Sequence, residues 1–265
     1  MKRILTIIDK EWAEIFKNRV VLMTIVLLPL IFTLLPLGIL YATRSGAAAG
    51  GSSTDVPPMF EQMCAQTTGA TGGECLQIFL LNEFLLLYMM MPLAIPVAIA
   101  AYSVVGEKTT RSLEPLLATP ISTEELLAGK GLAAVIPAIL ATWGAFAIFV
   151  VGMPLVGASP AVFRSLFSPT WLVAVLIVGP LMAAMAVNFA IIVSSRVSDP
   201  RTAEQVSMII IVPLLGVLFA QVAGVLVVNV RLMIGVAVVL AAVDVALIYA
   251  GARWFRRENI LTQWR

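Results

Sequence analysis

The chain has 265 residues, of which 60% are hydrophobic and 12% are charged, and its mean hydropathy is +1.01. Soluble domains average roughly 45–50% apolar and about 25% charged residues, so this composition excludes an ordinary water-soluble fold. The net charge of +2 argues against nucleic acid as a partner, and the absence of histidine excludes Ser-His hydrolysis and His-ligated zinc. We therefore expect an all-α integral membrane protein without a metal site.

Residues 1–19 are predicted to form an amphipathic interface helix. Apolar side chains, including Ile8, Trp12 and Phe16, recur at helical spacing, and Lys10 lies among polar residues on the other side. Such a helix is expected at the inner membrane surface, with its apolar side in the acyl boundary and its lysines near anionic headgroups. Two roles stay open for it, namely a membrane anchor and a contact for a cytoplasmic partner.

Six hydrophobic runs follow, each close to the length of about 20 residues that a helix needs to cross a bilayer. Lipid cannot satisfy bare backbone groups, so these runs are predicted to be transmembrane helices. Prolines interrupt five of them and are expected either to kink the helices or to act as hinges. The predicted spans are residues 20–42, 79–105, 132–156, 171–193, 206–228 and 232–249.

The distribution of positive charge predicts the orientation of these spans. With a cytoplasmic N-terminus, 14 of the 17 Lys and Arg residues fall on the inner side, and only Arg44, Arg164 and Arg231 fall outside. Cytoplasmic segments carry the excess of positive charge in membrane proteins. We expect a multi-pass protein of the cell (inner) membrane with both termini in the cytoplasm.

The longest outer connection, residues 43–78, contains both cysteines of the chain, Cys64 and Cys75. The outer side of a cell membrane is oxidising, so a disulfide between them is expected. Two free thiols are the alternative. Metal binding by two cysteines without histidine is disfavoured.

The cytoplasmic segment 107–121, between the second and third spans, is predicted to contain a short docking helix. Leu113, Leu116 and Leu117 share one helix face, and Pro120 ends the helix. Ser122 begins the next helix because a glutamate follows three residues later, which is a capping box. Leucines exposed on this side need cover from a protein partner or from the membrane surface.

Three polar side chains within or near the spans are candidates for a pathway or a gate. Asp244 lies inside the last span, where a charge costs about 2.5–3.5 kcal/mol, so it should be paired, protonated or facing water. Glu83 lies near the outer end of the second span, and interfacial solvation is the alternative to a gate. Asn188 is expected either to join Asp244 in a pathway or to hydrogen-bond between helices.

The run GEKTTRSLEPLLATPISTEELLAGK, residues 106–130, resembles the signature of type-2 ABC-transporter permeases, the membrane subunits of ABC exporters. The resemblance extends to KEWAEIFKNR, residues 10–19, and to SDPRTAEQVS, residues 198–207. It implies that segment 107–121 is a coupling segment that docks on a nucleotide-binding subunit, with a second, smaller contact near residues 198–204. The residues expected to couple to the ATPase are Arg111, Leu113, Glu114, Leu116, Leu117, Ser122, Asp199 and Arg201.

The resemblance also implies the partners. No phosphate-binding G-x-x-x-x-G-K-[ST] motif occurs in the chain, so ATP and Mg²⁺ are expected on a separate ABC-type ATPase subunit. Six spans are half of the usual twelve, so a second permease copy or a paralogue is expected as well, within membrane lipid. The alternative is a secondary transporter or channel-like protein without an ATPase. Re-entrant outer helices common in the family would fall near residues 220–231, where they are either absent or follow a shorter fifth span.

Overall fold

The computed structural model describes residues 2–48, 72–109 and 123–254, and within these ranges all regular structure is helical. The helices are α1 (Lys2–Ile15), α2 (Arg19–Ala48), α4 (Gly72–Tyr88), α5 (Met91–Thr109), α7 (Thr123–Leu155), α8 (Pro160–Leu166), α9 (Pro169–Val173), the π-helix η1 (Ala174–Val178), α10 (Gly179–Arg196), α11 (Pro200–Ser207), the 3₁₀-helix η2 (Met208–Ile211), α12 (Val212–Val222) and α13 (Val230–Trp254).

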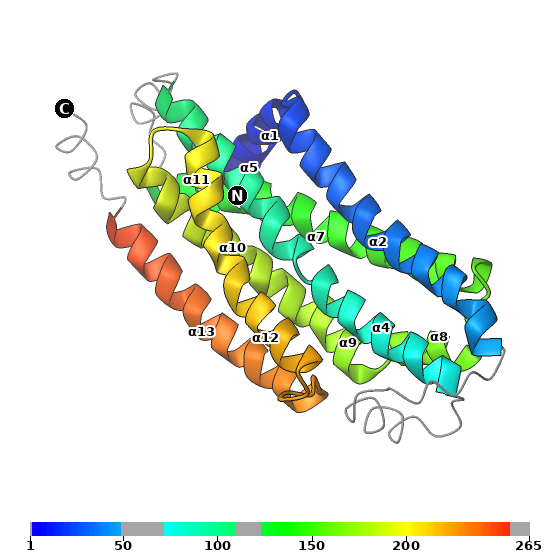
Figure 1. The fold of residues 1–265 in the computed structure, drawn as a ribbon. Helices are drawn as coiled ribbons and strands as arrows, with labels where there is room; N and C mark the ends of the chain where they lie inside the picture. The colour runs from blue at the N-terminus through cyan, green and yellow to red at the C-terminus, as the bar shows by residue number, and fades with distance from the viewer. Residues whose placement is uncertain (1, 49–71, 110–122, 255–265) are drawn as a thin grey trace.

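Six helical stretches are long and apolar enough to cross a membrane, which confirms the predicted all-α fold with six spans. The second combines α4 and α5, the fourth runs from α8 to α10, and the fifth joins α11, η2 and α12. Their bounds are Val21–Thr43, Glu74–Gly106, Glu125–Leu155, Pro160–Arg196, Pro200–Val222 and Val230–Gly251. In Figure 1 the spans lie side by side in an elongated bundle, with α1 and the end of α13 at the same end.

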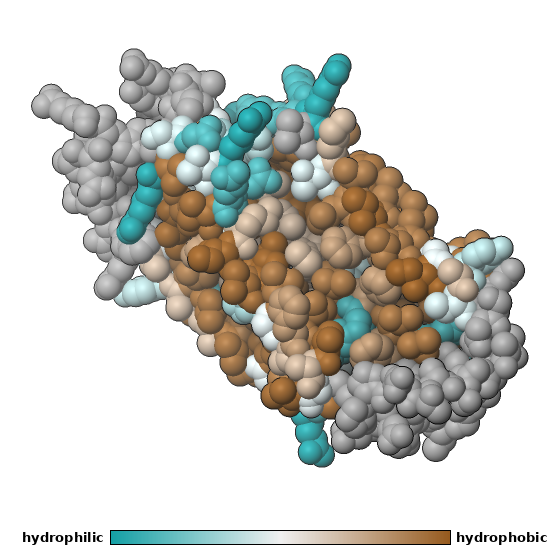
Figure 2. Space-filling view, in the orientation of Figure 1, coloured by the Kyte–Doolittle hydropathy of each residue, from teal (hydrophilic) through white to brown (hydrophobic). Residues whose placement is uncertain are grey.

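The bundle is built around α5 and α10, which pack closely against each other. Every residue from Met91 to Ala101 is buried, and the facing side of α10 presents the buried alanines Ala183, Ala186 and Ala190. Small residues let transmembrane helices approach closely. By contrast, only 17% of the apolar stretch of the first span and 22% of the sixth are buried. These outer helices give the bundle the apolar sides seen in Figure 2, with hydrophilic residues gathered at its ends.

Three irregular turns each precede a proline, which lacks the N–H that an unbroken helix needs. The second span breaks at Met89 and Met90, two residues before Pro92. The π-helix η1 ends just before Pro180, and the 3₁₀-helix η2 just before Pro213. Such π and 3₁₀ turns are where helices absorb a lost hydrogen bond.

The fifth span, Pro200–Val222, is as long as the predicted 206–228 but lies six residues earlier in the chain. Its helix ends at Val222 instead of residue 228, because Gly224 takes a positive φ of 75° and terminates it. The amide of Val225 then bonds back to the carbonyl of Ala220 at 2.9 Å. Residues 223–229 contain no helix, so this connection holds no re-entrant element.

The first outer connection is also shorter than the predicted 43–78. Helix α2 continues to Ala48 and α4 already begins at Gly72, so the first turn of α4 contains Cys75. Cys75 is buried and disulfide-bonded. Its expected partner, Cys64, lies outside the described residues, so their pairing stays a prediction.

Candidate coupling site and intramembrane polar residues

Helix α1 packs one side of its apolar face against the bundle. Its buried face is formed by Ile7, Ile8, Glu11 and Ile15, and it lies mainly against α7. Phe16, predicted on the apolar face, is 56% exposed just after the helix end, and Leu5 is 59% exposed. Part of the apolar face is therefore covered within the chain, and the contact of the remainder with the acyl boundary stays a prediction.

The contacts between α1 and α7 advance in step along both helices, so the two run side by side in the same direction. Arg3 forms an ion pair with Glu125 at 3.7 Å. About two and a half turns further along α1, the indole Nε1 of Trp12 donates to the carbonyl of Ala133 at 3.0 Å. Trp12, predicted as an interface residue, is thus an anchor onto α7. Lys10 is partly exposed and pairs with Glu14 at 3.6 Å.

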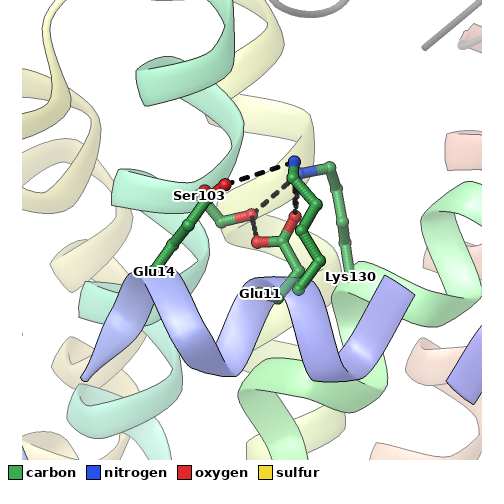
Figure 3. Close-up of polar contacts among 5 residues, drawn as sticks. Glu11, Glu14, Ser103 and Lys130 are labelled. Carbon is green, nitrogen blue, oxygen red and sulfur yellow. Dashed lines mark hydrogen bonds and ion pairs between the residues drawn. The ribbon is translucent and has the colours of Figure 1, made fainter. Parts of the chain in front are cut away.

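A buried polar cluster joins α1 to both helices that flank the coupling segment (Figure 3). Lys130 Nζ lies 2.7 Å from Glu11 Oε1 and donates to Ser103 Oγ at 3.0 Å. Ser103 Oγ in turn donates to Glu11 Oε2 at 2.5 Å. Glu11 is only 2% exposed and Lys130 6%. Both carboxylate oxygens are therefore bonded, which is what a buried ion pair needs to be tolerated.

The cluster contacts both of the helices that flank residues 110–122. Ser103 lies near the end of α5, and Lys130 lies in the second turn of α7. Residues 110–122, between these helices, are outside the described part of the chain. Glu11 therefore connects α1 to the helix entering this segment and to the helix leaving it.

Gly129 allows the close approach of α1 to α7. A Cβ atom at this position would lie 2.8 Å from Cγ2 and 3.0 Å from Cβ of Ile7, distances at which the neighbour must move. At Gly131, on the same helix, the nearest atom to such a Cβ would be Cγ1 of Val187 at 3.7 Å, an ordinary contact. The two glycines therefore form a matched pair for substitution.

We expect Gly129→Ala to destabilise the docking of α1 by about 1–3 kcal/mol, as overpacking does. Gly131→Ala should be neutral or stabilise by up to about 1 kcal/mol, because alanine favours the helix. Urea or thermal unfolding of the purified chain in nanodiscs measures the difference. Adding Ile7→Ala to Gly129→Ala should relieve the clash. Equal effects of the two glycine substitutions would contradict the close approach.

The second predicted contact, near residues 198–204, is a well-formed helix start. Asp199 caps α11, and its carboxylate accepts from the amide of Thr202 at 2.9 Å and from its hydroxyl at 3.0 Å. These hydrogen bonds lower the pKa of Asp199. Arg201 is exposed beside it. Helix α11 packs on α5, and Ala203 forms a small buried cluster with Ala101 and Val105 of that helix.

The remaining residues expected to couple to the ATPase fall in the segment whose structure is not described. They are Arg111, Leu113, Glu114, Leu116, Leu117 and Ser122. Their roles stay predictions. Asp199 and Arg201 lie at the start of α11, and both α11 and α7 contact α5, the helix that precedes that segment.

The predicted gate residue Glu83 forms a contact between the second and fifth spans. Gln221 Nε2 donates to Glu83 Oε1 at 2.9 Å. The other oxygens of the pair, Glu83 Oε2 and Gln221 Oε1, are buried and have no hydrogen-bond partner. Next to it, the indole of Trp171 donates to Asn82 Oδ1 at 2.6 Å. Glu83 is thus bonded to protein at one oxygen, and the residue is partly exposed.

The other two gate candidates lie together at a different place. Asp244 on α13 is 6% exposed and faces Asn188 on α10. Neither carboxylate oxygen of Asp244 has a partner within hydrogen-bonding geometry. The predicted gate residues therefore form two separate polar sites, one between α4 and α12 and one between α10 and α13.

Within the described residues the molecule is an all-helical integral membrane protein, in which an amphipathic N-terminal helix is locked onto a bundle of six spans. Residues 5–233 match the family model described as ABC-2 family transporter protein. The chain belongs to this family, which confirms the resemblance seen in its cytoplasmic segment. It is therefore a membrane component of a transporter and not itself catalytic. A search of curated proteins finds no match.

Proposed function

We propose that this chain is the permease subunit of an ATP-driven exporter, working as a dimer with separate ATPase subunits that bind ATP and Mg²⁺. The family supports a permease, and permeases of this family generally work with an ABC ATPase. The observation that carries the coupling proposal is the buried Glu11–Lys130–Ser103 cluster. It joins α1, α5 and α7 around the segment expected to dock on the ATPase.

In this proposal, ATP-driven closure of the ATPase subunits moves the coupling segment, and the cluster makes α1 move with it. Packed helices transmit such motion as rigid bodies. The end of the bundle with α1 lies in the cytoplasm, following the excess of positive charge on that side. Both termini are then cytoplasmic, and the protein resides in the cell (inner) membrane.

A second copy or a paralogue would complete the pathway. Apolar side chains remain exposed along α2, α12 and α13, where lipid or another permease must cover them. These include Leu27, Leu34, Phe219 and Val238. The dimer supplies twelve spans around one route for the cargo.

The test is co-purification of the full-length chain with an ATPase subunit, followed by hydrolysis and transport assays in proteoliposomes. We expect vanadate to inhibit hydrolysis and export together. Cysteine labelling should find residues 107–125 accessible only from the cytoplasmic side. Labelling from the outer side, or transport in vesicles that contain no ATPase, would instead favour a secondary transporter or channel.

A further inference from the structure

Glu83 lies at the centre of a partly exposed apolar stripe on α4. Phe79, Leu80, Glu83 and Leu87 recur at helical spacing, and each is partly exposed. The opposite side of the helix, including Leu81 and Leu85, is almost completely buried in the bundle. A carboxylate on the outward side of a transmembrane helix is costly unless a charge or water compensates it. Figure 2 shows a small hydrophilic patch interrupting the apolar side of the bundle.

The protein compensates Glu83 only in part. Gln221 is 1% exposed, and its amide nitrogen provides the one hydrogen bond that Glu83 receives. An ionised carboxylate accepts hydrogen bonds but does not donate them, so the side chain of Gln221 must turn its NH₂ group toward Glu83. Its amide oxygen, Oε1, then has no bond to Glu83. Two acceptor oxygens, Glu83 Oε2 and Gln221 Oε1, are left buried without partners. Unpartnered buried acceptors mark a place that a ligand can complete.

The charge that would compensate the Glu83 carboxylate is positive. Glu83 and Asp244 form no ion pair among the described residues, whereas Lys130 is neutralised by Glu11. No group of three or more candidate metal ligands occurs in the described part of the chain. Two oxygens are too few to replace the hydration shell of a metal ion, and the surrounding stripe is apolar. Both features suit a cation that carries its own apolar body.

We propose that Glu83 and Gln221 form a binding site for the cargo, and that the cargo is an amphipathic organic cation. Its charged group lies against Glu83 Oε2 and Gln221 Oε1, and its apolar body lies along Phe79, Leu80 and Leu87. This inference rests on the proposed transport function and adds to it the chemical class of the substrate.

The probe is octylammonium, whose ammonium group can donate hydrogen bonds to both free oxygens, and its binding to the purified full-length chain in nanodiscs is measured by equilibrium dialysis. Octyl sulfate has the same alkyl chain with the opposite charge and reports partitioning into lipid. We expect the ammonium ion to bind the wild-type chain and the sulfate to show only partitioning. Glu83→Gln should lower the affinity for the cation about tenfold or more, because it removes the charge without changing the shape.

The charge-swapped double variant Glu83→Gln with Gln221→Glu should recover the affinity, which a misfolded chain would not do. Glu74→Gln, an acidic residue in the first turn of the same helix, should bind like the wild type. Equal binding to Glu83→Gln and wild type would overturn the site. Displacement of the probe by sodium ions in the wild type alone would overturn the organic cargo in favour of an inorganic cation.

The assay contains no ATPase, so its result is independent of the proposed coupling. A chain that copurifies with an ATPase and shows vanadate-sensitive hydrolysis, but binds the cation independently of Glu83, refutes this inference and leaves the proposed function standing. A chain that binds the cation through Glu83 but never associates with an ATPase refutes the proposed coupling to an ATPase and leaves the binding site standing.

Discussion

Replacing Lys130 with methionine should destabilise the docked position of α1 by about 3 kcal/mol, the low end of the cost of breaking a buried ion pair. The substitution removes the ammonium that lies 2.7 Å from the buried carboxylate of Glu11 and leaves it only the partly exposed Lys10, whose Nζ lies 3.8 Å from Oε1. Undocking exposes α1, so trypsin should cut after Lys10 much faster than in the wild type. Mass spectrometry of the released fragments in nanodiscs measures this rate directly.

The double variant Glu11→Leu with Lys130→Met should recover most of the lost stability, because apolar replacement of a whole buried pair is often neutral or stabilising. Lys130→Arg would keep the charge but change the geometry, since a guanidinium is planar and larger than an ammonium. Arg3→Met is the surface control. Its ion pair with Glu125 is partly exposed and should contribute at most about 1 kcal/mol. A single Lys130→Met variant as resistant to trypsin as wild type would refute the role of the cluster.

Substituting alanine for both Leu116 and Leu117 should separate ATP hydrolysis from transport. If these side chains anchor the contact with the ATPase subunit, their loss should weaken it by about 2–4 kcal/mol, or about 30-fold to 1,000-fold. We expect the ATPase to dissociate during purification, or to hydrolyse ATP without export. Pull-down of the ATPase and export from proteoliposomes are the two measurements.

A matched control for this experiment lies in the first span. Leu34 and Leu35 are adjacent leucines on α2, 59% and 49% exposed on the apolar side of the bundle. Their double alanine variant removes the same atoms from the chain without touching the cytoplasmic segment. It should therefore leave ATPase binding unchanged. Normal coupling after loss of Leu116 and Leu117 would show that the ATPase docks elsewhere.

The number of spans could be predicted from sequence because bilayer thickness imposes a length of about 20 apolar residues on each helix. The ends of the spans were harder to predict. Hydropathy continues through Val225 and Leu226, but Gly224 ends the helix by its backbone conformation. That signal is local and could have been found in the sequence, since glycine commonly ends helices in this way.

The Glu11–Lys130–Ser103 cluster and the Glu83–Gln221 contact could not be predicted from local sequence signals. Glu11 is bonded to Lys130 across 119 positions, and Gln221 to Glu83 across 138. Helical spacing places Glu11 on the same face as Ile7 and Ile15, but it does not show which charge meets the carboxylate there. Its burial follows from Ser103 and Lys130 meeting it, and from Gly129 leaving room for α1. Such pairings depend on tertiary packing, which hydrophobic periodicity does not encode.

The length of α7 has a consequence for how the two sides of the membrane communicate. Its 33 residues extend about 50 Å, well beyond the hydrocarbon thickness of about 30 Å. At one end α1 presses on Gly129, and at the other Leu37 would lie 2.6 Å from a Cβ added at Gly152. Ala138, fully buried between them, lies about 14 Å from the first glycine and about 21 Å from the second. If α7 pivots there, a 2 Å push at the inner end becomes an opposite swing of about 3 Å at the outer end.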